Sequence, residues 1–222
     1  MACSVAGTFC VPVFLGAITV TKRLQLGVLI SGSGRTLQNF VELIARGELQ
    51  AEIGVVISSL SKVKGVERAR AAGLPVVIIR NQDHPDVDEF SRRIVETLER
   101  HDVQLACQAG WTCYWRLPER WLGRVMNIHP ALLPKFGGKG FYGHHVHQAV
   151  LAAGEKESGC TVHFANNEYD AGPIILQRKV LVLPEDTPDS LAARVFEQEC
   201  IAYPEAINRF ARGQLAKMVA GP

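Results

Sequence analysis

The sequence predicts an α/β fold: an open, mostly parallel, twisted sheet with helices on both faces and an appended β-hairpin-like C-terminal portion. Three observations support this prediction. Short β-type runs alternate with helical patterns from residue 24 onward, most of these runs are apolar throughout, and two successive runs near residue 170 have no helix between them. Wholly apolar strands separated by helices are typical of parallel, Rossmann-like sheets that are covered on both faces.

The first half of the chain supplies the parallel part of the sheet. Its β-type runs end at polar or glycine-rich turns, and its helical patterns carry one apolar stripe. The clearest helix places Phe90, Ile94 and Leu98 on one face. In chain order, the expected elements are strand 24–30, helix 37–46, strand 51–58, helix 66–72, strand 75–79, helix 86–100, strand 103–109 and strand 125–128.

The second half changes character. A helix is expected at 144–153, and two β-type runs follow at 160–165 and 173–183. The polar turn 166–172 joins these two runs directly, so they predict a hairpin-like unit at the edge of the sheet.

The last helix begins after Thr187, a favourable N-cap, with Pro188 at its first position. Pro204 is expected to kink or divide it, because proline lacks the N–H that the helix interior needs. No linker rich in proline, serine or glycine separates the two halves. We therefore interpret residues 24–222 as a single domain and residues 1–23 as an extension.

The extension contains an uncharged run from Val5 to Val20. This run resembles the apolar part of a signal peptide, but the basic residues Lys22 and Arg23 follow it instead of preceding it. It is also short for a membrane helix. We interpret it as a poorly ordered segment or a start site placed too far upstream, with export or anchoring as the alternative.

Composition excludes several classes of protein. Lys and Arg number 24 against 22 Asp and Glu, a net charge of +2, which gives no electrostatic reason to expect nucleic acid as a partner. The six cysteines form no C-x-x-C pair, so neither a zinc ribbon nor a disulfide framework is predicted. We expect a cytoplasmic protein, monomer or homodimer, that acts on small molecules without a membrane partner.

The first chemical candidate is the glycine loop that follows the first strand, Ser31-Gly32-Ser33-Gly34-Arg35-Thr36. Backbone N–H groups and the positive end of a helix dipole favour an anion at such a position. The loop is neither a Walker A motif nor a complete dinucleotide fingerprint. Arg35 favours a phosphate, because its guanidinium suits phosphate geometry. A tight turn that merely needs glycine is the alternative.

The second and third candidates are polar residues at a strand end and in the polar turn. Asn127 and His129 alternate at the end of strand 125–128, so they lie on the same side of the chain, where open sheets bind ligands. An amide and an imidazole there form a plausible oxyanion site. Asp170 lies in the turn 166–172. A structural histidine and ordinary turn chemistry remain the alternatives.

Taken together, these features resemble the 10-formyltetrahydrofolate-dependent formyltransferase family, in particular its phosphoribosylglycinamide formyltransferase branch. The resemblance covers roughly residues 24–215. The Asn-Ile-His-Pro motif is common to the whole family, whereas the glycine loop and the short C-terminus favour this branch. The segments that support the resemblance are 28–34, 109–111, 127–134, 159–164 and 170–175.

The resemblance implies a reaction and a role for each catalytic candidate. The amine of glycinamide ribonucleotide attacks the formyl carbon of the co-substrate 10-formyltetrahydrofolate, as in de novo purine (IMP) biosynthesis. Asn127 donates to the developing oxyanion, and a protonated His129 stabilises it. Asp170 pairs with His129 and raises its pKa, and a water moves the proton from the amine. No metal is implied.

The resemblance also implies two substrate subsites. Residues expected to bind the ribonucleotide and its phosphate are Gly32, Ser33, Gly34, Arg35, Thr36 and Glu199. Residues expected to bind the folate are Trp111, Thr112, Cys113, Tyr114, Trp115, Asn127, Asn166, Asn167, Glu168 and Tyr169.

The chain departs from the family pattern at several positions. Residues 35–36 are Arg-Thr where relatives often have a small hydroxyl residue and asparagine, and Cys200 stands in place of a common histidine. Val87 occupies the position of an arginine that some relatives have near the folate, which leaves Arg92 or Arg93 as candidate replacements.

The role of the loop 137–143, longer than in the shortest relatives, stays open. The nearby His144, His145 and His147 invite a metal interpretation. No carboxylate or cysteine stands beside them at a ligand-like spacing, so the rim of the substrate pocket or an exposed helix start is favoured.

Three other functions remain as alternatives. A formyltetrahydrofolate hydrolase usually carries an N-terminal regulatory domain, and a methionyl-tRNA formyltransferase usually has a further C-terminal domain and a basic surface. A non-catalytic phosphate- or nucleotide-binding module needs the glycine loop but has no use for Asn127, His129 and Asp170 together.

Overall fold

In the computed structural model, which describes residues 23–219, seven strands form one sheet in the order β3-β2-β1-β4-β5-β6-β7. The extension expected at 1–23 lies outside the described residues except for Arg23. The strands are β1 (Leu24–Ile30), β2 (Ala51–Ser58), β3 (Val76–Ile78), β4 (Leu105–Gln108), β5 (Val125–His129), β6 (Glu157–Phe164) and β7 (Ile174–Leu181).

Helices cover this sheet. They are α1 (Arg35–Ala45), α2 (Lys64–Ala71), α3 (Val87–Arg100), α4 (His144–Ala152), α5 (Pro188–Ala211) and α6 (Ala216–Val219), with short 3-10 turns at Asn81–Asp83 and Glu119–Trp121. Within residues 23–219, no helix combines the length and apolar character that a membrane crossing requires.

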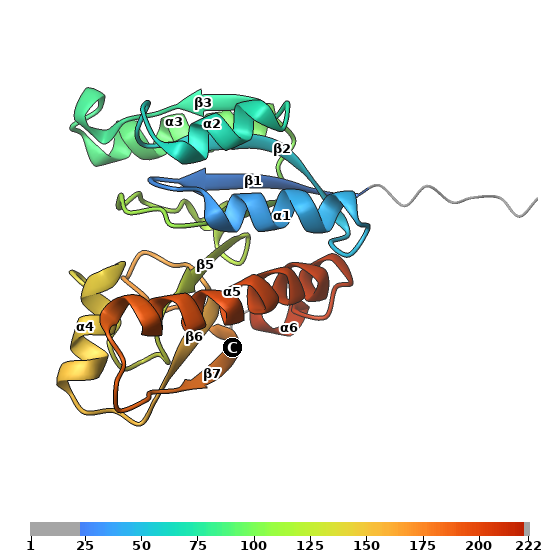
Figure 1. Ribbon diagram of the computed structural model, residues 1–222. Helices are drawn as coiled ribbons and strands as arrows, with labels where there is room; N and C mark the ends of the chain where they lie inside the picture. Colours follow the sequence, from blue (N-terminus) through green and yellow to red (C-terminus); the bar gives the residue numbers. More distant parts are fainter. Residues whose placement is uncertain (1–22, 220–222) are drawn as a thin grey trace, which may run out of the picture.

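The pairing of the strands confirms the predicted fold class. β1 to β5 run parallel to one another, whereas β6 pairs antiparallel with both β5 and β7. The hairpin-like unit is therefore joined to the parallel part through β5, and strands from both halves of the chain share one sheet (Figure 1).

Most elements begin and end within a few residues of their expected bounds, and two differences have a physical reason. α1 begins at Arg35 instead of residue 37, because Gly34 in the left-handed region turns the chain directly into the helix. β6 begins at Glu157 instead of residue 160, and Glu157 forms a 2.8 Å ion pair with Lys179 of β7. Charged residues thus extend the strand beyond its apolar run.

Each face of the sheet has its own apolar core. On one face, α1 and α5 pack together, with the rings of Phe40 and Tyr203 edge to face at 5.2 Å between centroids. Figure 1 shows α1 in blue and α5 in red on this same side. On the other face, α3 buries Phe90 and Ile94 beside the fully buried Trp121.

The expectation that Pro204 divides the last helix is wrong. α5 continues through it, from Pro188 to Ala211. Proline cannot donate to the carbonyl four residues earlier, which here belongs to Cys200. Asn39 of α1 donates its Nδ2 to that oxygen at 2.9 Å. A neighbouring helix therefore supplies the hydrogen bond that Pro204 cannot make.

The sheet also determines where a ligand can bind. β1 pairs with β2 on one side and with β4 on the other, so the chain order of the strands reverses at β1. Open α/β sheets bind ligands beyond the carboxyl ends of strands at such a point. There, Ser31 Oγ accepts from Ser59 Oγ at 2.7 Å and from the Thr112 N–H at 3.0 Å. These bonds hold the loops after β1, β2 and β4 together.

Candidate functional site

A cavity of about 450 Å³ opens at the carboxyl ends of the parallel strands. This volume is in the range of a typical small-molecule site. Every site residue put forward from the sequence lines it except Asn167. The Asn167 side chain instead accepts from the Leu117 N–H at 2.7 Å and donates to the Leu117 carbonyl at 3.0 Å. Asn167 therefore fixes the turn 166–172 against the aromatic segment.

The glycine loop forms one end of the cavity, and its two glycines differ. Gly34 has φ +69, and a Cβ there would lie 2.5 Å from the Gly65 Cα, so this position needs glycine for structural reasons. A Cβ at Gly32 would meet nothing within 4 Å. The tight-turn alternative thus accounts for Gly34 but leaves Gly32 unexplained. The open space at Gly32 is what a close ligand would require.

The N-terminus of α1 faces the same end of the cavity without a competing group. No side chain caps it, and its first turn contains no acidic residue. The first backbone N–H groups of a helix have no partner within the helix, and the helix dipole places positive charge there. This end can therefore bind an anion.

Arg35 and Glu199 line this end from opposite elements, α1 and α5. Burial raises the pKa of Glu199 to about 7, and the positive charge of Arg35 lowers it in part. A carboxyl with such a pKa can accept hydrogen bonds from ribose hydroxyl groups in either protonation state.

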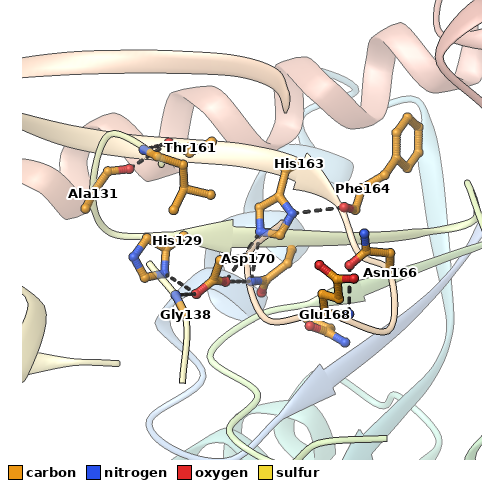
Figure 2. Close-up of polar contacts among 12 residues, drawn as sticks. His129, Ala131, Gly138, Thr161, His163, Phe164, Asn166, Glu168 and Asp170 are labelled. Carbon is orange, nitrogen blue, oxygen red and sulfur yellow. Dashed lines mark hydrogen bonds and ion pairs between the residues drawn. The ribbon is translucent and has the colours of Figure 1, made fainter. Parts of the chain in front are cut away.

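Asn127, His129 and Asp170 meet in the middle of the cavity. Asn127 and His129 lie two residues apart on β5, and Asp170 comes from the turn between β6 and β7. Asn127 Nδ2 is 3.3 Å from Asp170 Oδ1, and His129 Nδ1 is 3.5 Å from Asp170 Oδ2. Figure 2 shows the Asp170 carboxylate between His129 and His163. Residues far apart in the chain thus form one polar cluster.

His163 is a fourth member of this cluster that the sequence analysis missed. It lies directly opposite Asn127 in the antiparallel pair of β5 and β6. His163 Nδ1 donates to the Phe164 carbonyl at 2.9 Å, which leaves Nε2 as an acceptor 3.2 Å from Asn127 Nδ2. Both strands were expected from the sequence, but their pairing was not. A prediction that β5 pairs with β6 would have placed His163 beside Asn127.

The amide of Asn127 keeps a donor for a ligand in this arrangement. Its two acceptors, His163 Nε2 and Asp170 Oδ1, lie 3.6 Å apart. One N–H of the amide can serve both, so the second remains available to an oxygen in the cavity.

The pKa of His129 lies below its ordinary value. Burial is the largest cause, and the charge of Asp170 and the Phe136 carbonyl raise the pKa without outweighing it. Asp170 thus acts in the expected direction and raises the pKa of His129, but removal of the imidazole from water lowers it more strongly. His129 Nε2 donates to the Phe136 carbonyl at 2.7 Å.

Asp170 remains ionised although it is partly buried. Burial raises its pKa, but the two neighbouring histidines and the Gly138 N–H together lower it below the ordinary value. The Gly138 N–H donates to Asp170 Oδ2 at 2.9 Å. Asp170 has φ +54, which aspartate tolerates better than most residues. The loop 137–143, whose role was open, thus supports the carboxylate through its backbone.

Thr161 holds the segment after β5 in place beneath the cluster. Its hydroxyl donates to the Ala131 carbonyl at 2.7 Å and accepts from the Leu133 N–H at 3.0 Å. Gln177 Nε2 also donates to this hydroxyl, at 2.8 Å. Figure 2 shows Thr161 against Ala131. This buried set of bonds fixes the chain that leads from His129 toward the loop.

Aromatic residues form another end of the cavity. Trp111 stacks on Phe90 with 6.2 Å between ring centroids, and Tyr114 lies 5.5 Å from Tyr169. The indole Nε1 atoms of Trp111 and Trp115 are buried without a hydrogen-bond partner. A flat aromatic ligand with acceptor atoms suits these walls.

Val87 stands where some relatives have an arginine near the folate. Neither candidate replacement, Arg92 or Arg93, lies at the aromatic end of the cavity. Arg92 pairs with Glu96 at 2.6 Å and Arg93 with Glu89 at 3.4 Å, on the exposed side of α3. Neither lines the cavity.

His144 and His147 line the cavity at the start of α4, with 6.4 Å between their ring centroids. His145 instead packs against Tyr142. The pKa of His147 is lowered to about 4, mainly by burial and in part by the charges of His144 and His129. Across residues 23–219, no three His, Cys, Asp or Glu side chains gather into a potential metal site.

The comparison with family models gives a match described as formyl transferase over residues 24–207. The chain is 36% identical over 193 residues to the phosphoribosylglycinamide formyltransferase of Haemophilus influenzae, covering 86% of this chain and 89% of that protein. It is 39% identical over 197 residues to the trifunctional purine biosynthetic protein adenosine-3 of Drosophila melanogaster, covering 86% of this chain. The chain spans only 14% of the length of that relative.

The comparison with solved structures agrees with the comparison of sequences. The structure of glycinamide ribonucleotide transformylase 1 from Symbiobacterium toebii matches with a TM-score of 0.80 at 39% identity, covering 86% of this chain and 89% of that one.

Proposed function

The chain belongs to the formyl transferase family, and from that premise we propose that it transfers a formyl group from 10-formyltetrahydrofolate to the amine of glycinamide ribonucleotide. The products are formylglycinamide ribonucleotide and tetrahydrofolate, in de novo purine biosynthesis. The names of the relatives above support this choice of substrates.

The proposal rests on one observation: Asp170 lies 3.3 Å from Asn127 and 3.5 Å from His129, and all three line a cavity that also has an anion-binding end and an aromatic end. A ribonucleotide phosphate suits the first end and a pterin ring suits the second. The two reacting groups then meet at the polar cluster. A phosphate-binding module would have no need for such a cluster.

The reaction forms one bond and breaks another. The amine nitrogen of the ribonucleotide attacks the formyl carbon, and a negative charge develops on the formyl oxygen. When the tetrahedral carbon collapses, the bond to N10 of the folate breaks. The amine loses one proton and N10 gains one, so the protein needs both a group that accepts a proton and a donor for the oxyanion.

The proposed role of Asn127 is to donate its remaining N–H to the oxyanion. His163 and Asp170 fix the amide in place through the contacts at 3.2 and 3.3 Å. A donor that is already oriented needs no reorganisation when the charge develops, which is why such groups contribute strongly to rate.

In the proposed role of His129, Nδ1 accepts the amine proton, either directly or through a water, and Asp170 lies 3.5 Å from that nitrogen. As the oxyanion develops, its negative charge raises the pKa of the imidazole and favours the imidazolium. Asp170 then stabilises the charged ring, which in turn stabilises the oxyanion.

The substrate subsites follow the two ends of the cavity. The residues proposed for the ribonucleotide are Gly32, Ser33, Gly34, Arg35, Thr36 and Glu199, all of which line the glycine-loop end. The folate is proposed to lie along 111–115, Asn166, Glu168 and Tyr169, and Asn167 acts there only by fixing the turn.

We further propose that residues 24–222 act as one domain, a view supported by the single sheet that joins both halves. The cytoplasm is the proposed location, in keeping with the free thiols of Cys107, Cys113, Cys160 and Cys200. Monomer and homodimer remain the two proposed states.

The deciding experiment is a spectrophotometric assay of formyl-folate turnover with and without glycinamide ribonucleotide. The proposal expects turnover that requires the ribonucleotide and yields its formylated product. Folate hydrolysis that ignores the ribonucleotide would favour a hydrolase, and formylation of methionyl-tRNA would favour the tRNA enzyme. Absence of any turnover would favour a binding module.

A further inference from the structure

Phe196 of α5 lies beneath the guanidinium group of Arg35. The Cζ atom of Arg35 is 3.9 Å from the centroid of the Phe196 ring. A cation within about 6 Å of a ring face is attracted by the electron density of the ring. The arginine at the first position of α1 therefore rests on an aromatic surface that belongs to another helix.

The two helices that make this contact are packed against each other. α1 and α5 pack together through the edge-to-face rings of Phe40 and Tyr203, and Asn39 joins the helices through the hydrogen bond to the Cys200 carbonyl. The relative position of Arg35 and Phe196 is thus set by two packed helices.

The positive charge of Arg35 is not neutralised by a nearby carboxylate. Within residues 23–219, none of the ion pairs at 4.0 Å or less involves Arg35, and Glu199 interacts with it only at longer range. Since an arginine side chain loses considerable rotamer freedom when it binds a ligand, a ring that orders it in advance reduces that loss.

The lining of the cavity shows that this pair belongs to the glycine-loop end. Ala192, Phe196 and Glu199 follow one another at helical spacing along one face of α5, and all three line the cavity together with Arg35. The guanidinium is accordingly held beside the uncapped N-terminus of α1.

We propose that Phe196 is a positioning residue for phosphate binding: its ring holds the Arg35 guanidinium ready for the phosphate monoester of the ribonucleotide. This inference rests on the proposed function for the identity of the substrate. Arg35 contacts the phosphate, and Phe196 acts through Arg35.

The test combines steady-state kinetics with calorimetric titration of glycinamide ribonucleotide. Phe196→Leu is expected to raise the ribonucleotide KM and Kd about two- to fivefold, the size of one exposed cation–π contact. Its kcat and its KM for formyl-folate are expected to stay within about twofold of the wild type. Phe196→Tyr keeps a ring face and is expected to restore wild-type values.

A double-mutant cycle separates positioning from direct contact. Arg35→Met is expected to weaken ribonucleotide binding on its own, and adding Phe196→Leu to Arg35→Met is expected to change nothing further. Phe210→Leu, which removes a ring from the same helix away from Arg35, serves as the matched control and is expected to leave the ribonucleotide KM unchanged.

Three results would overturn the inference: an unchanged Kd in Phe196→Leu, an equal loss in the Arg35→Met background, or a loss that appears in kcat instead of KM. Failure of the proposed function gives a different result, because the wild type itself would then not formylate the ribonucleotide. In that event, titration with inorganic phosphate tests the Arg35–Phe196 pair directly, and wild-type binding equal to that of Phe196→Leu contradicts it.

Discussion

The two working regions of the cavity are built in different ways. The glycine-loop end comes mainly from one continuous segment, 31–36, and presents backbone N–H groups at the start of α1. The polar cluster is assembled from three separate segments, since Asn127 and His129 lie on β5, His163 on β6, and Asp170 in the following turn. In the proposed function, the first region holds the ribonucleotide and the second acts on the reacting groups.

This difference predicts different consequences of mutation. Loss of a side chain in the cluster should reduce kcat, because these groups meet charge that exists only during the reaction. Changes at the glycine loop should appear in the ribonucleotide KM or in stability. The variants below test this contrast, from the largest expected effect to the smallest.

Asp170→Asn is expected to lower kcat by about 10² to 10⁴, because His129 loses the charge that stabilises its protonated form. Asparagine suits the positive φ of this position and can still accept from the Gly138 N–H. Steady-state kinetics and a thermal melt check the result together. A folded variant with a nearly wild-type kcat would contradict the role given to this carboxylate.

Asn127→Ala is expected to lower kcat by about 10² to 10³, the usual effect of removing one oxyanion donor. The ribonucleotide KM should change little, since the amide faces the reacting carbonyl and not the phosphate. The same kinetic assay measures both values. If the loss lies wholly in KM, Asn127 binds substrate and does not stabilise the oxyanion.

Gly34→Ala and Gly32→Ala form a matched pair at the other region. Gly34→Ala is expected to destabilise the fold by about 1–3 kcal/mol through its positive φ, and more through the clash with the Gly65 backbone. Gly32→Ala meets no atom of the protein, so it should leave stability unchanged and raise the ribonucleotide KM. Urea unfolding and kinetics separate the two. Equal destabilisation by both variants would argue against a ligand at Gly32.

Glu199→Gln is expected to change how stability depends on pH. The folded pKa of Glu199 is raised from 4.5 to about 7, mainly by burial. The contribution of this carboxyl to stability is therefore fully present below its unfolded pKa and is lost as the pH rises through about 7. Glutamine has no such proton, so the variant should gain stability relative to wild type between about pH 5 and about pH 8. Urea unfolding at both pH values checks this, and a constant difference would contradict the raised pKa.

The contrast between the regions also explains what the sequence could predict. The glycine loop is continuous, so its chemistry could be predicted from adjacent residues. The succession of strands and helices along the chain followed from alternating patterns. Asn127 and His129 were found because alternation places them on one side of a strand. Asp170 was a candidate because of its place in the polar turn, but its catalytic role came from the family resemblance.

The remaining features depend on long-range pairing and on the backbone. His163 joins the cluster only through the pairing of β5 with β6. The Gly138 N–H and the Phe136 carbonyl are backbone groups, so a search for functional side chains does not consider them. Burial lowers the pKa of His129 and opposes the effect of Asp170, which raises it. That Pro204 does not divide α5 could not be predicted, because the compensating donor, Asn39, lies on another helix.

The most direct measurement is the distance from Asn127 Nδ2 to the formyl oxygen in a crystal structure with glycinamide ribonucleotide and a non-transferable formyl-folate analogue. We expect a hydrogen bond of about 2.7–3.2 Å, with the ribonucleotide amine facing the formyl carbon. A formyl group bound away from the amide, the imidazole and the carboxylate would contradict the assignment of these three side chains to the reaction.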